Sequence, residues 1–172
     1  MQIVKSFKHL LTIPIILLAV AMMISACGGA RLITVGDKAP DFKLQTPSGV
    51  NRSLSEFQGS NVFLIFEQIP CAYCDAQRPH IQNALQSSNT KISVISIYCE
   101  NSPANVEKDI KEKGLTNFGI ALVDTEATVG TQCGFGKAYP YNVLIDGNGI
   151  VKAVKIGPFT NSDEVTTWLK SL

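Results

Sequence analysis

The sequence has almost no excess of charge of either sign. Among 172 residues, 15 Lys and Arg stand against 14 Asp and Glu, which gives a formal net charge of +1. A nucleic-acid-binding protein would carry a clustered basic excess, so the balance argues against that class. The sequence also lacks repeats and low-complexity stretches, and it contains only two histidines, His9 and His80. These shortages indicate a near-neutral globular domain.

Charge is also missing from most of the N-terminal segment. After Lys5 and Lys8, Cys27 is the only side chain from residue 10 to residue 30 that carries an ionisable group. An apolar run at 10–24 leads into Ile-Ser-Ala-Cys, which resembles the lipobox of bacterial lipoproteins. In a lipobox the cysteine thiol is acylated and becomes the mature N-terminus.

The lipobox resemblance implies three segments. These are a signal peptide at 1–26, the lipidated Cys27 with a short tether at 27–32, and one domain at 33–172. The competing interpretation is an uncleaved transmembrane helix, because the uncharged stretch approaches the roughly 20 residues that a membrane span requires. Both interpretations place the C-terminal part outside the cytoplasm.

The rest of the chain alternates between strand and helix patterns. Strand patterns occur at 61–66, 91–98, 120–123, 141–145 and 150–156, and helix patterns occur at 71–88, 103–113, 125–132 and 161–169. The Asp-Gly-Asn-Gly sequence at 146–149 is a hairpin signal between the last two strands. This order predicts an α/β domain with helices packed on a central sheet.

The most informative motif is Cys-Ala-Tyr-Cys at 71–74, between a buried strand and a helix. The first sulfur there lies beside the unpaired N–H groups of the helix N-terminus, which stabilise a thiolate. The second lies one turn further on, where it can attack a mixed disulfide formed by the first. A structural zinc site is the rival interpretation, but it usually needs a second Cys/His pair at matching spacing. Cys99, Cys133 and His80 do not supply one.

Four motifs within residues 33–172 occur together in the order of a known family. They are Val-Gly-Asp-Lys-Ala-Pro-Asp-Phe at 35–42, the CxxC of Cys71 and Cys74, Pro79 in the following helix, and Tyr139-Pro140 ahead of the strand at 141–145. Together they resemble the thioredoxin-fold family of anchored extracytoplasmic thiol–disulfide proteins, the TlpA/ResA type, within the wider AhpC/TSA-like group.

The resemblance implies a thioredoxin fold. This is a central mixed sheet flanked by helices, with an N-terminal extension and an inserted strand and helix before the cis-proline strand. In this topology the strand at 141–145 runs antiparallel to the strand at 61–67. Tyr139 and a cis Pro140 would then lie beside the CxxC and offer strand-like hydrogen bonds to an extended substrate.

The resemblance also implies a function and a location. The dithiol would reduce or exchange disulfides in exported proteins, with apocytochrome maturation as one role, and a membrane electron donor of the CcdA type would restore it. The protein would be lipid-anchored at the extracytoplasmic face of the cell membrane. No cofactor is implied.

The sequence departs from the family pattern near the CxxC. Pro70 stands where an aromatic residue usually precedes the first cysteine, and Ile65 occupies the position of the buried acid that many thioredoxins use as a proton acceptor. Glu67, on the same strand face as Ile65, is one replacement. Glu100 is another, because ResA-type proteins carry an acid there in the active-site cavity, and this family position favours Glu100. For both, a solvated surface carboxylate is the alternative.

Two other functions share part of the pattern. A peroxiredoxin has the same N-terminal signature, but it also needs a Pro-x-x-x-Thr/Ser-x-x-Cys loop and a catalytic arginine. That loop is missing, and none of Arg31, Arg52 and Arg78 follows the second strand. A Cu(I)-delivery protein would use the soft thiolates, but its Sco-type version has a longer cysteine spacing and a distant histidine. Thiol–disulfide exchange is the favoured function.

Cys99 and Cys133 are two further cysteines, which the family does not require. Both fall on the sheet edge expected to carry the active site. In an oxidising compartment they are a candidate second disulfide, if their Cα atoms lie within about 7 Å. Such a bridge could brace the active-site rim or exchange with Cys71 and Cys74. The alternative is two buried free thiols that pack as small hydrophobic side chains.

Overall fold

The computed structural model describes residues 32–134 and 138–172. The predicted signal peptide and the lipidated Cys27 lie outside the described residues. The elements in chain order are β1 (Lys43–Gln45), β2 (Asn51–Ser53), η1 (Leu54–Phe57), β3 (Asn61–Glu67), α2 (Ala72–Gln86), β4 (Ile92–Cys99), α3 (Pro103–Glu112), η2 (Leu115–Asn117), β5 (Ile120–Asp124), α4 (Thr128–Gln132), β6 (Tyr141–Ile145), β7 (Val151–Ile156) and α5 (Ser162–Leu169). None of the described helices is long and apolar enough to cross a membrane.

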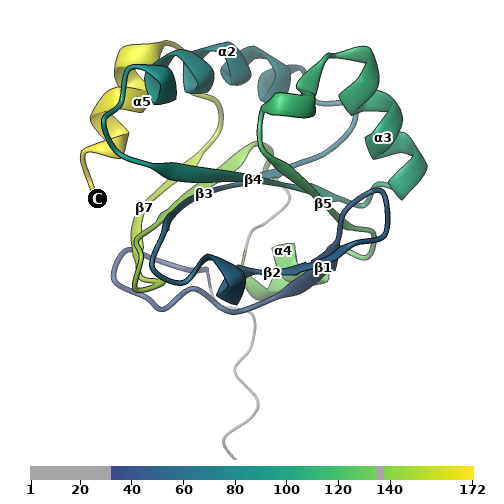
Figure 1. Ribbon diagram of the computed structural model, residues 1–172, viewed down its shortest axis with the longest axis horizontal. Helices are drawn as coiled ribbons and strands as arrows, with labels where there is room; N and C mark the ends of the chain where they lie inside the picture. The colour runs from purple at the N-terminus through teal and green to yellow at the C-terminus, as the bar shows by residue number, and fades with distance from the viewer. Residues whose placement is uncertain (1–31, 135–137) are drawn as a thin grey trace, which may run out of the picture. The chain divides into compact units, whose positions relative to one another are not determined.

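The strands of the described residues form one mixed sheet in the order β2-β1-β5-β4-β3-β6-β7 (Figure 1). β3, β4 and β5 are parallel. β6 is antiparallel to β3, with Phe66 opposite Tyr141, which confirms the predicted direction of the strand after Pro140. The N-terminal extension contributes the β1–β2 hairpin, which pairs antiparallel with β5.

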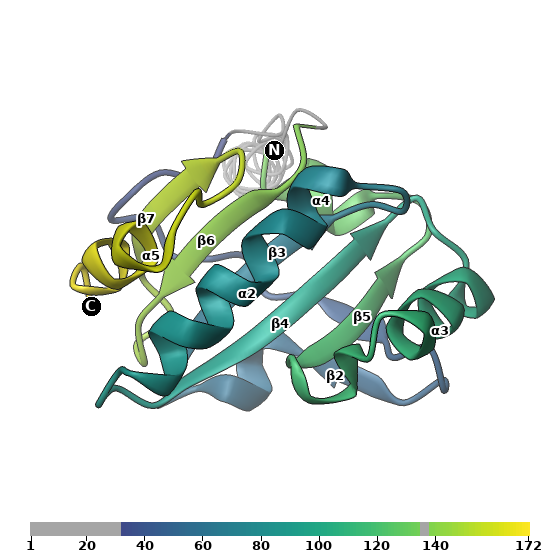
Figure 2. The same cartoon turned by 90° about the horizontal axis from the view of Figure 1, so that it is seen from above.

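The centre of the sheet is apolar along most of its length. β3 is buried from Val62 to Glu67 and β4 from Val94 to Cys99. Continuous burial of this kind fits parallel strands that are covered on both faces. Helices α2, α3 and α5 lie on one face of the sheet, and α4 lies on the other (Figures 1 and 2).

Alternation along β3 divides its side chains between two hydrophobic clusters. Phe63 and Ile65 pack with residues of α2 and α5. Leu64 and Phe66 pack on the opposite face with residues of β6 and α4. Burying each such side chain contributes about 1.5–3 kcal/mol. The first cluster holds α2 against the sheet and therefore fixes where the helix begins relative to the end of β3.

Two element boundaries differ from the sequence prediction in ways that affect the site. α2 begins at Ala72 instead of residue 71, because Cys71 has an extended backbone (φ −146°, ψ 94°) and caps the helix. β4 continues through Cys99 instead of ending at residue 98, because Cys99 still pairs with Asp124 of β5.

Candidate active site

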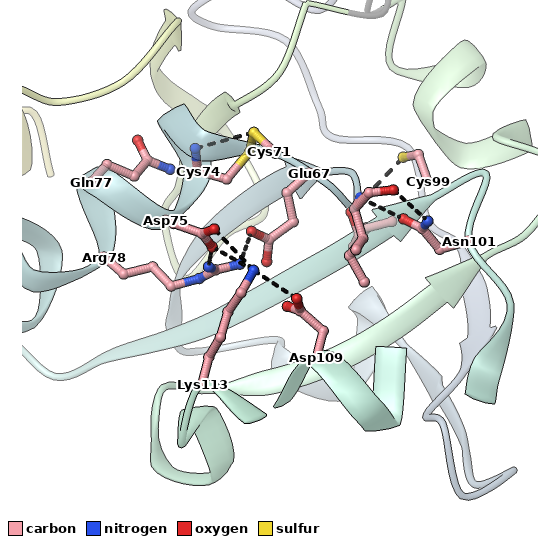
Figure 3. A network of polar contacts seen from close by, with 12 residues as sticks. Glu67, Cys71, Cys74, Asp75, Gln77, Arg78, Cys99, Asn101, Asp109 and Lys113 are labelled. Carbon is pink, nitrogen blue, oxygen red and sulfur yellow. Dashed lines mark hydrogen bonds and ion pairs between the residues drawn. A yellow bond between two sulfur atoms is a disulfide. The ribbon is translucent and has the colours of Figure 1, made fainter. Parts of the chain in front are cut away.

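A disulfide between Cys71 and Cys74 lies at the N-terminus of α2 (Figure 3). The two Cα atoms are 5.2 Å apart. Cys71 is half-buried, and its Sγ accepts a hydrogen bond from the backbone N–H of Cys74 at 3.1 Å. Cys74 is fully buried. The sulfur nearer to solvent is therefore the one that the helix N-terminus can stabilise as a thiolate.

The loop between β3 and α2 is held by the segment that follows β4. Asn101 Oδ1 accepts the backbone N–H of Ile69 at 3.0 Å, and Asn101 Nδ2 donates to the carbonyl of Ile69 at 3.3 Å. Gln68 Nε2 donates to Glu100 Oε2 at 3.1 Å. Asn101 was not predicted from the sequence. The signal that could have found it is its position just after β4, the strand that pairs in parallel with β3, because β3 leads into the CxxC.

Pro140 lies at the same end of the sheet. Because Phe66 near the end of β3 is opposite Tyr141 at the start of β6, the Tyr139–Pro140 bond lies near the loop that leads into Cys71. This peptide bond is cis, as the resemblance implied. The Ile69–Pro70 bond is also cis, which the sequence analysis did not anticipate.

Of the two carboxylates considered as proton acceptors, Glu67 is the buried one. Its side chain is 1% exposed, and its Oε2 lies 2.5 Å from Arg78 Nη2. Burial raises the pKa of Glu67, and the charge of Arg78 opposes the rise. Glu67 Oε1 has no hydrogen-bond partner in the described part of the chain. Glu100, which the family position favoured, is exposed.

Glu67 and Arg78 begin a series of ion pairs that reaches α3 (Figure 3). Arg78 also pairs with Asp75 in the first turn of α2. Lys113, the residue after α3, lies 2.9 Å from Asp75 Oδ2 and 2.6 Å from Asp109 Oδ1. Although burial alone would lower the pKa of Lys113, its hydrogen bonds with Asp109 and Asp75 raise it overall. This series was not predicted from the sequence, because two of its links, Glu67–Arg78 and Asp75–Lys113, join residues of different elements.

Gln77 is a buried amide one turn beyond Cys74. Its Nε2 donates to Asn142 Oδ1 at 3.1 Å, and Asn142 Nδ2 donates back to Gln77 Oε1 at 3.3 Å. Asn142 belongs to β6, two residues after Pro140, so the pair joins the active-site helix to the cis-proline strand. The sequence signal for Gln77 was its helical spacing: it lies three residues after Cys74 and four before Ile81, on the buried face of α2.

Cys99 and Cys133 are free thiols, both buried in the hydrophobic cluster on the α4 side of the sheet. Burial raises the pKa of Cys99 and of Cys133 to about 12, so both thiols are protonated at neutral pH. In the structure the two cysteines are separate free thiols and do not form the candidate second disulfide. Cys99 Sγ donates a hydrogen bond to the backbone carbonyl of Ile97 at 3.8 Å. The two thiols pack as small hydrophobic groups among apolar side chains.

Known proteins resemble the chain in both sequence and fold. The AhpC/TSA family matches residues 35–154. The thiol-disulfide oxidoreductase ResA of Geobacillus thermodenitrificans is 33% identical over 133 residues, which cover 76% of this chain and 74% of that protein.

Solved structures also share the fold. The thioredoxin domain of a thiol-disulfide oxidoreductase from Bacteroides vulgatus has a TM-score of 0.66 at 17% identity and covers 78% of this chain and 97% of its own. An exposed lipoprotein thioredoxin from Streptococcus pneumoniae has a TM-score of 0.63 at 26% identity, with coverages of 77% and 100%.

These similarities and the site agree on one chemistry. The mixed sheet flanked by helices is the thioredoxin fold that the sequence predicted, and its active-site helix begins at a CxxC disulfide. The chain therefore belongs to the AhpC/TSA family and is a thioredoxin-fold thiol–disulfide oxidoreductase of the ResA/TlpA type.

Proposed function

We propose that this oxidoreductase exchanges disulfides with exported proteins, using Cys71 as the attacking thiol and Cys74 as the resolving thiol. The observation that supports this assignment is the asymmetry of the pair. Cys71 is half-buried at the cap of α2, whereas Cys74 is fully buried one turn further on. An external disulfide therefore reaches Cys71 before Cys74.

In the reducing direction, the Cys71 thiolate attacks a substrate disulfide. A bond forms between Cys71 Sγ and one substrate sulfur, and the other substrate sulfur leaves as a thiolate and takes up a proton. Cys74 then loses its proton and attacks Cys71 Sγ, which releases the second substrate thiol. Two electrons pass to the substrate, and the Cys71–Cys74 disulfide remains. A CcdA-like membrane donor, implied by the resemblance, would reduce it again.

Tyr139 and Pro140 are the proposed contact for the substrate. They precede β6 at the end of the sheet where β3 leads into the CxxC, which favours strand-like pairing with an extended substrate segment. Glu100 or Glu67 would accept the proton of Cys74. Comparing Glu67→Gln with Glu100→Gln separates these candidates, because loss of the true acceptor slows release of the mixed disulfide without preventing its formation.

The test of the cysteine roles is trapping. Cys74→Ala should accumulate mixed disulfides with exported proteins, whereas Cys71→Ala should not, because the remaining thiol is buried. Equal trapping by the two variants would contradict the assignment. The reduction potential then gives the direction of exchange, since dithiols of this architecture range from about −270 to about −120 mV.

The proposed attachment to the membrane is a separate claim. The lipobox-like sequence before Cys27 supports a lipid anchor at the extracytoplasmic face. Labelled fatty acid should enter the wild-type protein and not Cys27→Ala. A membrane-bound protein that keeps residues 1–26 would instead favour the transmembrane interpretation.

A further inference from the structure

The first turn of the active-site helix carries a negative charge beside the dithiol. Asp75 directly follows Cys74, and its backbone N–H donates to the carbonyl of Cys71 at 3.1 Å. The Asp75 side chain is 38% exposed. An ionised carboxylate in this position opposes a thiolate on Cys71, against the favourable effect of the helix N-terminus.

Two cations hold the Asp75 carboxylate. Arg78, on the same helix, also pairs with the buried Glu67. Lys113, beyond the end of α3, lies 2.9 Å from both carboxylate oxygens of Asp75, and it also pairs with Asp109. Three acids share two bases here, so the loss of Lys113 leaves Asp75 with a cation that is already shared with Glu67.

We propose that Lys113 is a positioning residue for the redox pair, because it neutralises Asp75 and so keeps the first turn of α2 from destabilising the Cys71 thiolate. The inference rests on the proposed attacking role of Cys71. It means that the residue at the C-terminal end of α3, far in sequence from the reacting cysteines, helps to set how oxidising the protein is. Stabilising the thiolate stabilises the reduced form and makes the dithiol a stronger oxidant.

Other charged groups lie around the dithiol and stay constant in the test. Glu67 approaches from β3, Glu100 follows β4, and Asp109 belongs to α3. Tyr139 lies beside the cis proline. The variants below retain all of these residues. Lys113→Met also removes the partner of Asp109, whereas Asp75→Asn leaves the Lys113–Asp109 pair intact, so agreement between the two variants assigns the effect to the Lys113–Asp75 pair.

The test replaces Lys113 with the uncharged, similarly long methionine in the purified full-length protein. Two quantities are measured: the equilibrium constant with glutathione, and the pH midpoint of alkylation of Cys71 after reduction. Both side chains of the Lys113–Asp75 pair are about one-third exposed, so solvent screens the pair and a moderate effect is expected. Lys113→Met should shift the equilibrium about threefold toward the disulfide, or about 14 mV more negative, and raise the alkylation midpoint.

Three further variants make the test specific. Lys108→Met is the matched control, because it removes the same charge from α3 at a side chain that is 72% exposed, and it should change neither quantity. Asp75→Asn should shift both quantities in the direction opposite to Lys113→Met. The double variant Asp75→Asn, Lys113→Met should match Asp75→Asn alone in both quantities. The shift caused by Lys113→Met should also shrink at high salt.

The possible outcomes are distinguishable. If folded Lys113→Met behaves like Lys108→Met, the inference is wrong. If Lys113→Met fails to fold, Asp75→Asn decides, with Asp163→Asn on α5 as its control. An unchanged alkylation midpoint in Asp75→Asn also overturns the inference. A wild-type protein that exchanges no disulfide with glutathione contradicts the proposed function, whereas an active wild type with indistinguishable variants contradicts only the role of Lys113.

Discussion

Replacing Arg78 with methionine should strongly destabilise the fold, because it leaves a buried carboxylate without its counter-charge. The side chains of Glu67 and Arg78 are 1% and 6% exposed, and their closest atoms are 2.5 Å apart. Methionine keeps much of the aliphatic length of arginine, so the loss of charge dominates. Removing one partner of a buried ion pair costs about 3–5 kcal/mol. We expect a loss of about 4 kcal/mol at pH 7.

The cost of Arg78→Met should depend on pH. Burial already raises the pKa of Glu67 above its usual value of 4.5, and the charge of Arg78 limits that rise. Without Arg78, the pKa of Glu67 rises further. Between the unfolded and folded values the folded state then binds more protons, so the free energy of unfolding falls as pH rises. The penalty should therefore be smallest near pH 4.5 and reach its full size above the raised pKa.

The assay is urea unfolding with the Cys71–Cys74 disulfide kept intact. With a denaturant slope of about 2 kcal/mol per molar, a loss of about 4 kcal/mol lowers the midpoint by about 2 M. Arg52→Met is the matched control, because it breaks a pair with Glu56 whose side chains are 32% and 42% exposed, and it should cost much less. The reasoning is refuted if both variants lose the same stability, or if the loss in Arg78→Met is independent of pH.

Three more predictions concern the buried thiols and the loop before the CxxC. Because the pKa of Cys99 and of Cys133 is about 12 in the folded state against 9.0 in the unfolded chain, the unfolding free energy should fall between pH 9 and 12, by up to about 1.4 kcal/mol per pH unit for each thiol. This fall with pH should be shallower in the double variant Cys99→Ala, Cys133→Ala. Peptide mapping of the unreduced protein should recover both as free thiols, and a peptide that links them would show that the bridge forms. Asn101→Ala should cost about 1–3 kcal/mol in thermal unfolding, since Ile69 loses two hydrogen bonds, whereas the exposed Asn105→Ala should cost little.

Several features of this protein were readable from local sequence. The apolar run of β3 and the Cys-Ala-Tyr-Cys motif placed a dithiol between a strand and a helix, and the structure places a disulfide at that position. The direction of β6 beside β3 also followed, because four motifs in order specify the topology. Such features depend on periodicity, spacing and the chemistry of residues close together in the chain.

The tertiary structure alone decided how the site is supported. Glu67 and Arg78 are 11 residues apart in sequence, and Asp75 and Lys113 are 38 apart. No local pattern distinguishes such partners from solvated surface charges. The β1–β2 hairpin was also unexpected, because its three-residue strands are mostly polar and gain their place by pairing with the edge of β5. The burial of Cys99 and Cys133 was likewise decided by the packing of α4 against the sheet and not by the sequence around each cysteine.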